Sequence, residues 1–260
     1  MQPDQPAACE RCGGIGFLIV EGESATRARV CGCRERAARP AGIAALLEAA
    51  RVPRRYAECD FENFAEHGDQ ALVLANAKEK ARRYAEEYPL SDRGLLFMGP
   101  SGVGKTHLSV AILRRLLSEK GVGCLFCDVQ DLLRQLQATF DRQSGMTQLE
   151  LLQPVLMTEV VVLDDLGMQR LTPWVEETLT HIVTTRYNER RATLVTTNYL
   201  DAPPDDLMQS LSDRIGVRVR SRLHEMCHLV PIPAKDFRIE IMRADHHLIS
   251  DRLDRPRERR

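Results

Sequence analysis

The sequence has no long apolar run, no excess of cationic residues and no secretory leader, and each absence narrows the class of protein. No segment of the 260 residues approaches the apolar length that a membrane-spanning helix needs. The first residues, Met1 to Asp4, lack the basic and apolar regions of a secretory signal, so we expect a cytoplasmic protein with no membrane partner. A formal net charge of -1 excludes nucleic-acid binding through bulk charge, and any such surface must be local.

Disulfide bonds are not expected in a cytoplasmic protein, so the eight cysteines are predicted to be thiols or metal ligands. Two close pairs stand near the start of the chain, with short strands expected between them at 17–20 and 28–30. This pattern indicates a zinc ribbon with four thiolates, although a C-x-C pair is tighter than the usual C-x-x-C. We expect structural zinc, with unliganded thiols or another metal as the alternatives. The predicted zinc ligands are Cys9, Cys12, Cys31 and Cys33.

A second C-x-x-C spacing, at Cys124 and Cys127, calls for a different interpretation. It lies in a predicted buried strand, where residues three apart point to opposite faces of the sheet. Buried free cysteine commonly packs as a small apolar residue, so we expect a structural role for both.

A glycine-rich run, G-P-S-G-V-G-K-T, matches the phosphate-binding loop of nucleotide triphosphatases. It follows a predicted buried strand at 94–98 and precedes a predicted helix at 107–117, which is the setting that the motif requires. Lys105 is expected to reach the β- and γ-phosphates, and the Thr106 hydroxyl to hold Mg²⁺. The predicted nucleotide-binding positions here are Gly99, Pro100, Ser101, Gly102, Val103, Gly104, Lys105, Thr106 and His107.

Two carboxylates follow the apolar run at 160–163, and they complete a Walker B pattern. Because the carboxyl ends of parallel strands face the phosphate loop, we expect Asp164 to coordinate Mg²⁺ opposite Thr106. Asp165 is expected to polarise the attacking water, and the short reach of aspartate predicts slow hydrolysis. The alternative is an acidic turn without a ligand.

Further predicted strands lie at 123–127, 193–197 and 228–232, with helices between them. This alternation predicts an α/β fold with a parallel sheet covered on both faces. A helix is also expected over 34–50, with an interruption at 40–42. Asp128 is expected to cap a helix that carries Phe140, and Thr172 to cap another with Pro173 in its first turn. Asn198 ends one of these strands, where an amide can hold the lytic water or sense the γ-phosphate. The segment 213–222 contains several arginines, of which Arg214, Arg218 and Arg222 share one face if the segment is one helix.

From Val52 to Arg238 the chain resembles bacterial replicative helicase loaders of the DnaC/DnaI type and their relatives, the IstB-type transposition ATPases. The resemblance rests on these motifs: V-P-R-R-Y with F-E-N-F, G-P-S-G-V-G-K-T-H-L, V-V-L-D-D-L-G, R-Y at Arg186 and Tyr187, T-T-N, S-R-L and D-F-R. The N-terminal cysteine pattern is similar to that of some loaders.

The resemblance implies an AAA+ core with a five-stranded parallel sheet and a reduced or absent lid. It implies that Asn198 is the sensor-1 residue, Arg222 the arginine finger and Arg238 the sensor-2 arginine, with Arg214 as a rival for the finger. The region around Tyr56 and Phe61 is expected to border the adenine.

The resemblance also implies a slow, partner-stimulated ATPase that uses ATP and Mg²⁺, self-associates through the ATP site, binds single-stranded DNA and delivers a replicative ring helicase. An IstB-type transposition helper and an ATP-binding adaptor with little hydrolysis are the alternatives. We expect a zinc module at 1–36 that contacts the helicase or, as second choice, DNA, then a linker and adenine-proximal segment at 37–69. The ATPase domain is expected at 70–242 and a charged, disordered tail at 243–260, with a DNA-binding arm as the alternative for the tail.

Overall fold

The computed structural model describes residues 9, 17–21, 26–31, 40–66, 68–91, 93–140, 147–203 and 208–239. Two of the predicted zinc ligands, Cys12 and Cys33, lie outside the described residues, as does the charged tail at 243–260. Near the start of the chain, strands β1 (Phe17–Glu21) and β2 (Thr26–Val30) pair antiparallel, with Phe17 opposite Val30. The two short strands expected between the cysteine pairs are therefore present.

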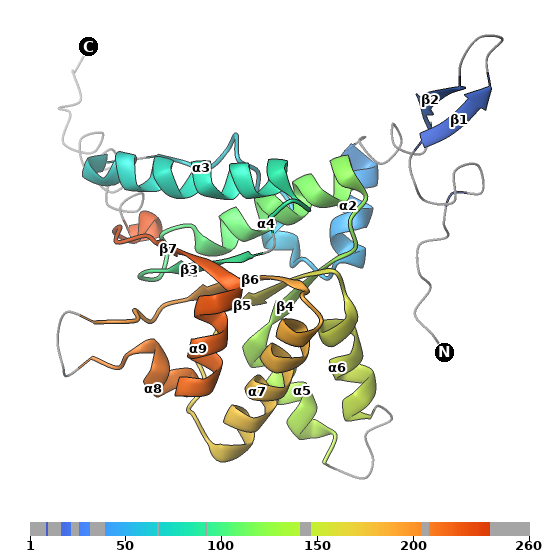
Figure 1. The fold of residues 1–260 in the computed structure, drawn as a ribbon. Helices are drawn as coiled ribbons and strands as arrows, with labels where there is room; N and C mark the ends of the chain where they lie inside the picture. The colour runs from blue at the N-terminus through green and yellow to red at the C-terminus, as the bar shows by residue number, and fades with distance from the viewer. Residues whose placement is uncertain are drawn as a thin grey trace, which may run out of the picture.

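The main sheet has five parallel strands in the order β4-β5-β6-β3-β7 (Figure 1). The three middle strands are almost entirely buried, which explains the continuous apolar runs of β3 and β5, while β6 also buries three threonines. The predicted five-stranded parallel sheet is confirmed. Its strands are β3 (Gly94–Met98), β4 (Cys124–Asp128), β5 (Val160–Asp164), β6 (Ala192–Thr197) and β7 (Cys227–Pro231).

Helices cover both faces of the sheet and enclose one apolar core on each side (Figure 1). One face carries α2 (Pro40–Ala49), α3 (Ala71–Glu87) and α4 (Lys105–Arg115), which continues as a π-helical turn, η3 (Leu116–Lys120). The opposite face carries α5 (Val129–Ala138), α6 (Gln148–Met157), α7 (Pro173–Asn188), α8 (Leu211–Ile215) and α9 (Val217–Met226). Short 3-10 turns, η1 (Arg54–Tyr56) and η2 (Gly68–Gln70), lie between α2 and α3.

The two cysteines of strand β4 illustrate how the sheet divides the molecule. Cys124 packs in the core beneath α3 and α4, while Cys127 packs in the core beneath α5 to α9. Both side chains are buried, and burial raises the pKa of the Cys127 thiol to about 12. The predicted structural role of this C-x-x-C pair is therefore confirmed.

Helix starts on the second face follow the predicted capping residues. The Asp128 carboxylate accepts a hydrogen bond from the Asp131 amide at the start of α5. The Thr172 hydroxyl does the same for Val175 at the start of α7, where Pro173 occupies the first turn. These caps set where α5 and α7 begin, and so place the loops that precede them at the carboxyl edge of the sheet.

Three local predictions were wrong. The expected interruption at 40–42 is instead the start of α2, because proline is favoured in the first helical turn. Phe140 lies beyond the end of α5 and is 60% exposed. The arginine segment is two helices, because Gly216 adopts φ +83° between α8 and α9, so Arg214 does not share a helical face with Arg218 and Arg222.

The segment between α2 and α3 packs against the main domain. Its residues Val52, Phe61 and Phe64, with Leu47 of α2, belong to the same apolar cluster as the inner residues of α3 and α4. None of the described helices is both long and apolar enough to cross a lipid bilayer.

Candidate nucleotide-binding site

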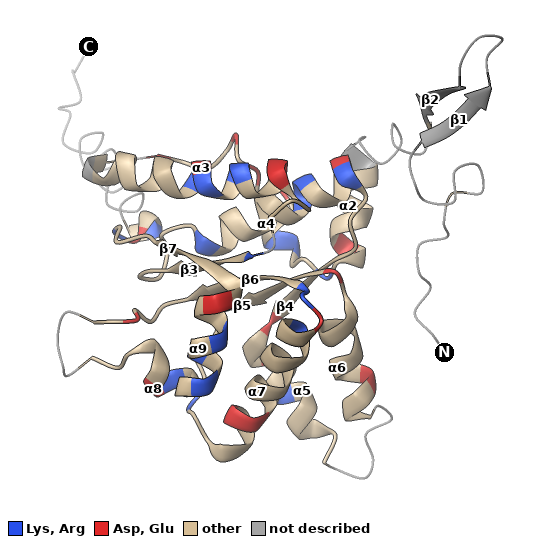
Figure 2. Ribbon diagram, in the orientation of Figure 1, with Lys and Arg blue, Asp and Glu red and all other residues tan. Residues whose placement is uncertain are grey.

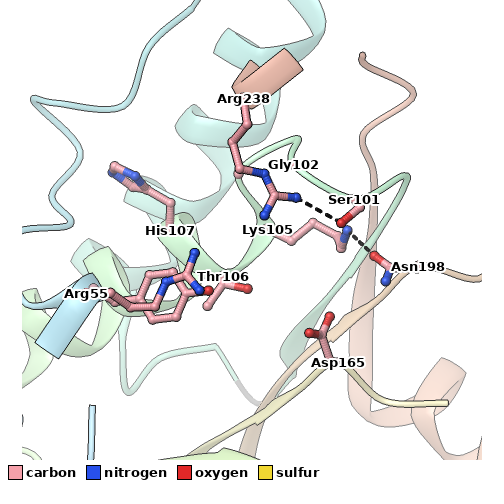
Figure 3. A pocket seen from close by; sticks show the side chains of 11 residues that line it. Arg55, Ser101, Gly102, Lys105, Thr106, His107, Asp165, Asn198 and Arg238 are labelled. Atoms are coloured by element: carbon pink, nitrogen blue, oxygen red, sulfur yellow. Dashed lines mark hydrogen bonds between the residues drawn. The ribbon is translucent and has the colours of Figure 1, made fainter. Parts of the chain in front are cut away.

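The predicted phosphate loop connects β3 to α4 at the carboxyl edge of the sheet (Figure 3). Gly104 adopts φ +92°, and a Cβ there would stand 2.4 Å from the Phe64 ring, so only glycine fits beneath that ring. Lys105 and Thr106 are the first residues of α4, and the unpaired amides of a helix start favour an anion. Val103 is buried below the loop.

Lys105 is 5% exposed. Its ammonium group donates two hydrogen bonds to carbonyl oxygens of the loop and a third to Asn198, which follows β6. Its Nζ lies 2.8 Å from the Gly99 carbonyl oxygen, 2.7 Å from that of Pro100 and 2.7 Å from Asn198 Oδ1 (Figure 3). Burial lowers the pKa of Lys105 to about 8, while the nearby Asp165 and Asp164 oppose the shift. The lysine is thus a desolvated cation aimed at the crevice where a phosphate binds.

Asp164 ends β5 and faces the first turn of α4. Its Oδ1 accepts hydrogen bonds from Thr106 Oγ1 at 2.9 Å and from Thr196 Oγ1 at 2.7 Å. Burial raises the pKa of Asp164 to about 6, although both hydroxyl donors favour the charged form. A carboxylate beside a hydroxyl is a donor set of hard oxygens, which fits Mg²⁺.

Asp165 follows at the mouth of the crevice with a left-handed backbone, φ +54°. Its amide donates to Thr196 Oγ1 at 2.9 Å, which fixes the direction of its side chain. Burial raises the pKa of Asp165, against the lowering effect of Lys105. A carboxylate held in this way at the edge of the phosphate crevice has the position and basicity of a group that orients water.

The remaining predicted residues form the outer wall (Figure 3). Arg238 Nη2 donates to Ser101 Oγ at 3.0 Å, and its Nε lies 3.2 Å from Asp236 Oδ1. His107 Nε2 lies 2.8 Å from the Asp60 carbonyl oxygen. The predicted residues that line the crevice are Tyr56, Ser101, Gly102, Gly104, Lys105, Thr106, His107, Asp165, Asn198 and Arg238.

Sequence reasoning missed three residues of this site. Arg55 lines the crevice, and its guanidinium lies 4.8 Å from the centre of the Tyr56 ring. Phe61, which was expected in the region near the adenine, is buried in the core. Thr196 bonds both Walker B residues, and the T-T-N run was its signal. Asp236 orients Arg238, and its place in the D-F-R run was a signal as well.

The two candidate finger arginines lie apart from the lining of this crevice. Arg222 is half-buried on α9. Arg214 on α8 donates to the carbonyl oxygens of Gly167, Met168 and Gln169 in its own chain. These contacts engage Arg214 within its own chain, whereas an arginine finger reaches the nucleotide of a neighbouring protomer.

At the N-terminal cysteines, the structure describes two of the four predicted ligands. The Sγ atoms of Cys9 and Cys31 lie 3.8 Å apart, and neither cysteine is in a disulfide bond. Among the described residues, which exclude Cys12 and Cys33, no group of three or more metal-ligating side chains occurs.

Comparisons with known proteins agree with this geometry. A family described as IstB-like ATP binding protein matches residues 34–244. The replicative helicase loader DnaC of Escherichia coli strain K12 is 30% identical over 165 residues, which are 64% of this chain and 62% of that protein. DnaC of Buchnera aphidicola subsp. Schizaphis graminum is 33% identical over 179 residues, 68% of each chain.

Solved structures show the same fold. The crystal structure of the DnaC helicase loader has a TM-score of 0.59 and 33% identity, and the match covers 69% of this chain and 99% of that one. The crystal structure of DnaI, at 23% identity and a TM-score of 0.54, supports the fold alone. The chain therefore belongs to the IstB-like ATP-binding proteins and is a homologue of the DnaC helicase loaders, with their AAA+ P-loop core.

Proposed function

We propose that this chain is a Mg²⁺-dependent ATPase that loads a replicative ring helicase onto single-stranded DNA. The observation that carries the proposal is the contact of Lys105 Nζ with Asn198 Oδ1 at 2.7 Å, beside the Thr106–Asp164 hydrogen bond. These two contacts support the proposed roles of Lys105 as the phosphate-binding residue, of Thr106 and Asp164 as ligands of the magnesium ion, and of Asn198 as the γ-phosphate sensor. The homology to DnaC loaders supports the choice of partner.

The residues of the crevice divide the work of hydrolysis. Bound Mg²⁺-ATP would supply the phosphoanhydride bond, and the cation would neutralise phosphate charge. Thr106 and Asp164 would hold the cation, and Lys105 would exchange its carbonyl contacts for phosphate oxygens. Asp165 accepts a proton from the attacking water, and Asn198 orients that water. Arg238 and Tyr56 close the outer side of the site.

Arg222 is proposed to complete the site of a neighbouring protomer. Arginines gather on α8 and α9 (Figure 2). Arg220 on α9 is bound by Asp201, whereas Arg222 forms no ion pair within the described residues. An uncommitted guanidinium on this helix can be attracted by the γ-phosphate of the next subunit. Hydrolysis removes that charge, so the oligomer loosens after each turnover.

An aromatic pair forms the proposed surface for single-stranded DNA. Phe140, 60% exposed, meets Trp174 of α7 edge to face, with ring centroids 5.9 Å apart. Phe140 is exposed, whereas Trp174 is partly buried against the core. Aromatic side chains that solvent can reach accept stacked bases without sequence preference, and each contact contributes about 1–3 kcal/mol. With a net charge of -1, the chain needs a local surface to bind DNA, and we propose this aromatic pair as part of it.

Replacing either ring by alanine is expected to weaken binding of labelled oligo(dT) by about 5- to 150-fold, which corresponds to about 1–3 kcal/mol. Fluorescence anisotropy with Mg²⁺-ATP present measures the change for Phe140→Ala and Trp174→Ala. Leu149→Ala on α6, where the leucine is 68% exposed, is the matched control and should bind as the wild type. Equal losses in all three variants, or in none, would exclude the aromatic pair as the surface.

A zinc site with Cys12 and Cys33 as further ligands fits the separation of the two described sulfurs. Tetrahedral zinc with Zn–S bonds of about 2.3 Å places its sulfurs about 3.8 Å apart. The Cys9 and Cys31 sulfurs are 3.8 Å apart, against about 2.05 Å in a disulfide. We propose that this module grips the helicase, since a closed tetrathiolate site leaves no position for catalysis.

The intact chain is expected to contain about one zinc per protomer and to capture a replicative ring helicase from the same cell when ATP is present. Elemental analysis and co-purification measure the two properties. Cys31→Ser should lose both, because three ligands hold structural zinc poorly. Buried Cys59→Ser is the control for loss of a thiol elsewhere. A zinc-loaded wild type that captures no helicase would contradict the loader assignment.

The family match at residues 34–244 keeps one alternative within the same chemistry, an IstB-type transposition helper. Such a protein would capture a transposase instead of a helicase in the same experiment. An adaptor that binds ATP without hydrolysis is the third possibility, and measured turnover excludes it.

A further inference from the structure

The guanidinium group of Arg214 grips three consecutive peptide carbonyls. Nε donates to the Gly167 oxygen at 2.7 Å, and Nη2 donates to those of Met168 and Gln169 at 2.9 and 2.6 Å. Nη1 donates to the side chain of Gln209 at 3.1 Å, and the group stacks on the Tyr199 ring at 4.9 Å. Four of the five guanidinium N–H donors of Arg214 are thus engaged within one chain.

The gripped segment is the loop that follows the Walker B carboxylates, and its other side rests on the sensor strand. The Leu166 amide donates to the Thr196 carbonyl oxygen at 2.8 Å, and Asn198 Nδ2 lies 3.3 Å from Met168 Sδ. Gly167 adopts φ +89°, and a Cβ there would lie 3.2 Å from Arg214 Cβ. The loop is therefore held between Asn198 and Arg214, with little room for any residue but glycine at its tightest point.

The same loop joins the ATP site to the aromatic surface. It leaves Asp165 at one end and enters the Thr172 cap of α7 at the other, so Trp174 lies in the helical turn that the loop feeds. Among the described residues, the buried Gln169 Nε2 atom has no hydrogen-bond partner, so at Gln169 the loop is held through its carbonyl oxygen, which accepts from Arg214.

We infer that Arg214 is a positioning residue that acts in cis and couples the ATP site to the DNA surface. It holds residues 167–169 against Asn198, so that a change of phosphate state at Asn198 and Asp165 moves the start of α7. The inference rests on the proposed function and deepens it. It also assigns the finger role to Arg222 alone, because the guanidinium of Arg214 is already engaged.

The coupling is measured as the ratio of oligo(dT) affinities with Mg²⁺-ATP and with Mg²⁺-ADP. A coupling between two sites typically changes affinity by about 5- to 150-fold, and we expect the wild type to fall in that range. In Arg214→Gln the ratio should fall to about 1, while nucleotide affinity stays within about threefold of the wild type because the phosphate contacts of Lys105 and Thr106 are untouched. Arg214→Lys should behave like the glutamine variant, because an ammonium cannot span three carbonyls.

Trp174 is the single tryptophan of the chain, so its fluorescence reports directly on the start of α7. The wild type should show different emission with Mg²⁺-ATP and Mg²⁺-ADP, and Arg214→Gln should not. The surface variant Arg82→Gln on α3 is the control and should keep the difference. Equal thermal midpoints of wild type and variants show that the variants are folded.

Mixed oligomers separate a cis residue from a trans one. Arg222→Ala mixed with Asp165→Asn should regain ATPase activity, because some interfaces then combine an intact crevice with an intact finger. Arg214→Gln mixed with Asp165→Asn should show no ATPase activity beyond that of its Arg214→Gln protomers, because a neighbouring protomer cannot repair a defect that acts in cis. Recovery in the second mixture would make Arg214 a trans residue and overturn the inference.

Different results would overturn the proposed function and the coupling role of Arg214. A wild type whose DNA affinity is the same with both nucleotides contradicts the proposed switch and the coupling together. A normal wild-type ratio that persists in folded Arg214→Gln overturns the role of Arg214 alone, and so does full rescue by Arg214→Lys.

Discussion

Asp165→Asn is expected to lower kcat for ATP hydrolysis by about 10²- to 10⁴-fold, the range that a positioned general base contributes. Affinity for Mg²⁺-ATP should change little, because Asp165 acts on the water and the Thr106–Asp164 pair is left intact. Asparagine has the shape of aspartate and tolerates the φ of +54°, so the loss isolates the charge. Steady-state ATPase assays with and without oligo(dT), together with binding of a fluorescent ATP analogue, measure the two effects.

Lys105→Ala is the matched contrast, since it should abolish binding as well as turnover. Removing a buried, hydrogen-bonded cation costs about 2–5 kcal/mol of binding free energy, or roughly 30- to 5,000-fold in affinity.

The pH dependence of kcat/KM provides a check on Asp164 and Lys105. Activity should fall below about pH 6 as Asp164 gains a proton and loses its cation, and above about pH 8 as Lys105 loses its charge. Unchanged turnover in Asp165→Asn would refute the hydrolysis assignment.

The centre of this site was predictable from sequence because its residues lie at strand ends and at a helix start. Asp164 ends an apolar strand, Asn198 follows strand β6 and Lys105 follows the glycine-rich loop after β3, and parallel strands bring their carboxyl ends to one edge. The glycine-rich loop is local in sequence, so its geometry needed no knowledge of distant contacts.

The residues that sequence reasoning missed depend on contacts between distant segments. Arg55 lies in an irregular segment, and it reaches the crevice because Phe64 packs on Gly104 and draws that segment across α4. The cis engagement of Arg214 depends on the break at Gly216, which turns α8 toward the loop after β5. Neither arrangement leaves a periodic pattern in the sequence.

Arg186 is the clearest case of a role that only the fold reveals. It stands in the last turn of α7, where a basic residue is ordinarily solvated, yet its side chain is 0% exposed. Its guanidinium donates to the carbonyl oxygens of Val155 and Thr158 at the end of α6 and to that of Ala192 at the start of β6. Burial lowers the pKa of Arg186 to about 10, so it remains charged at neutral pH.

These contacts join the ends of three elements by one cation and explain why arginine is needed there. The carbonyls at the end of α6 have no partner within the helix and carry the negative end of its dipole. A hydrogen bond of 2.9 Å from Nε to Thr193 Oγ1 fixes the plane of the guanidinium. Within the part of the chain that the structure describes, each hydrogen-bond acceptor of Arg186 is an uncharged oxygen. The cation is therefore stabilised by dipoles instead of by a counter-ion.

Arg186→Met is therefore expected to lower the free energy of unfolding by about 3–5 kcal/mol, because it leaves several buried carbonyls unpaired. That is a large share of the roughly 5–15 kcal/mol that stabilises a typical domain. Arg186→Lys should lose less, since an ammonium keeps the charge but reaches fewer of the oxygens. Urea unfolding followed by circular dichroism measures both changes. Arg82→Met, at an exposed position of α3, is the control and is expected to keep the wild-type midpoint. If Arg186→Met unfolds at the wild-type urea concentration, the buried cation is not what holds α6, α7 and β6 together, and apolar packing alone must account for that side of the core.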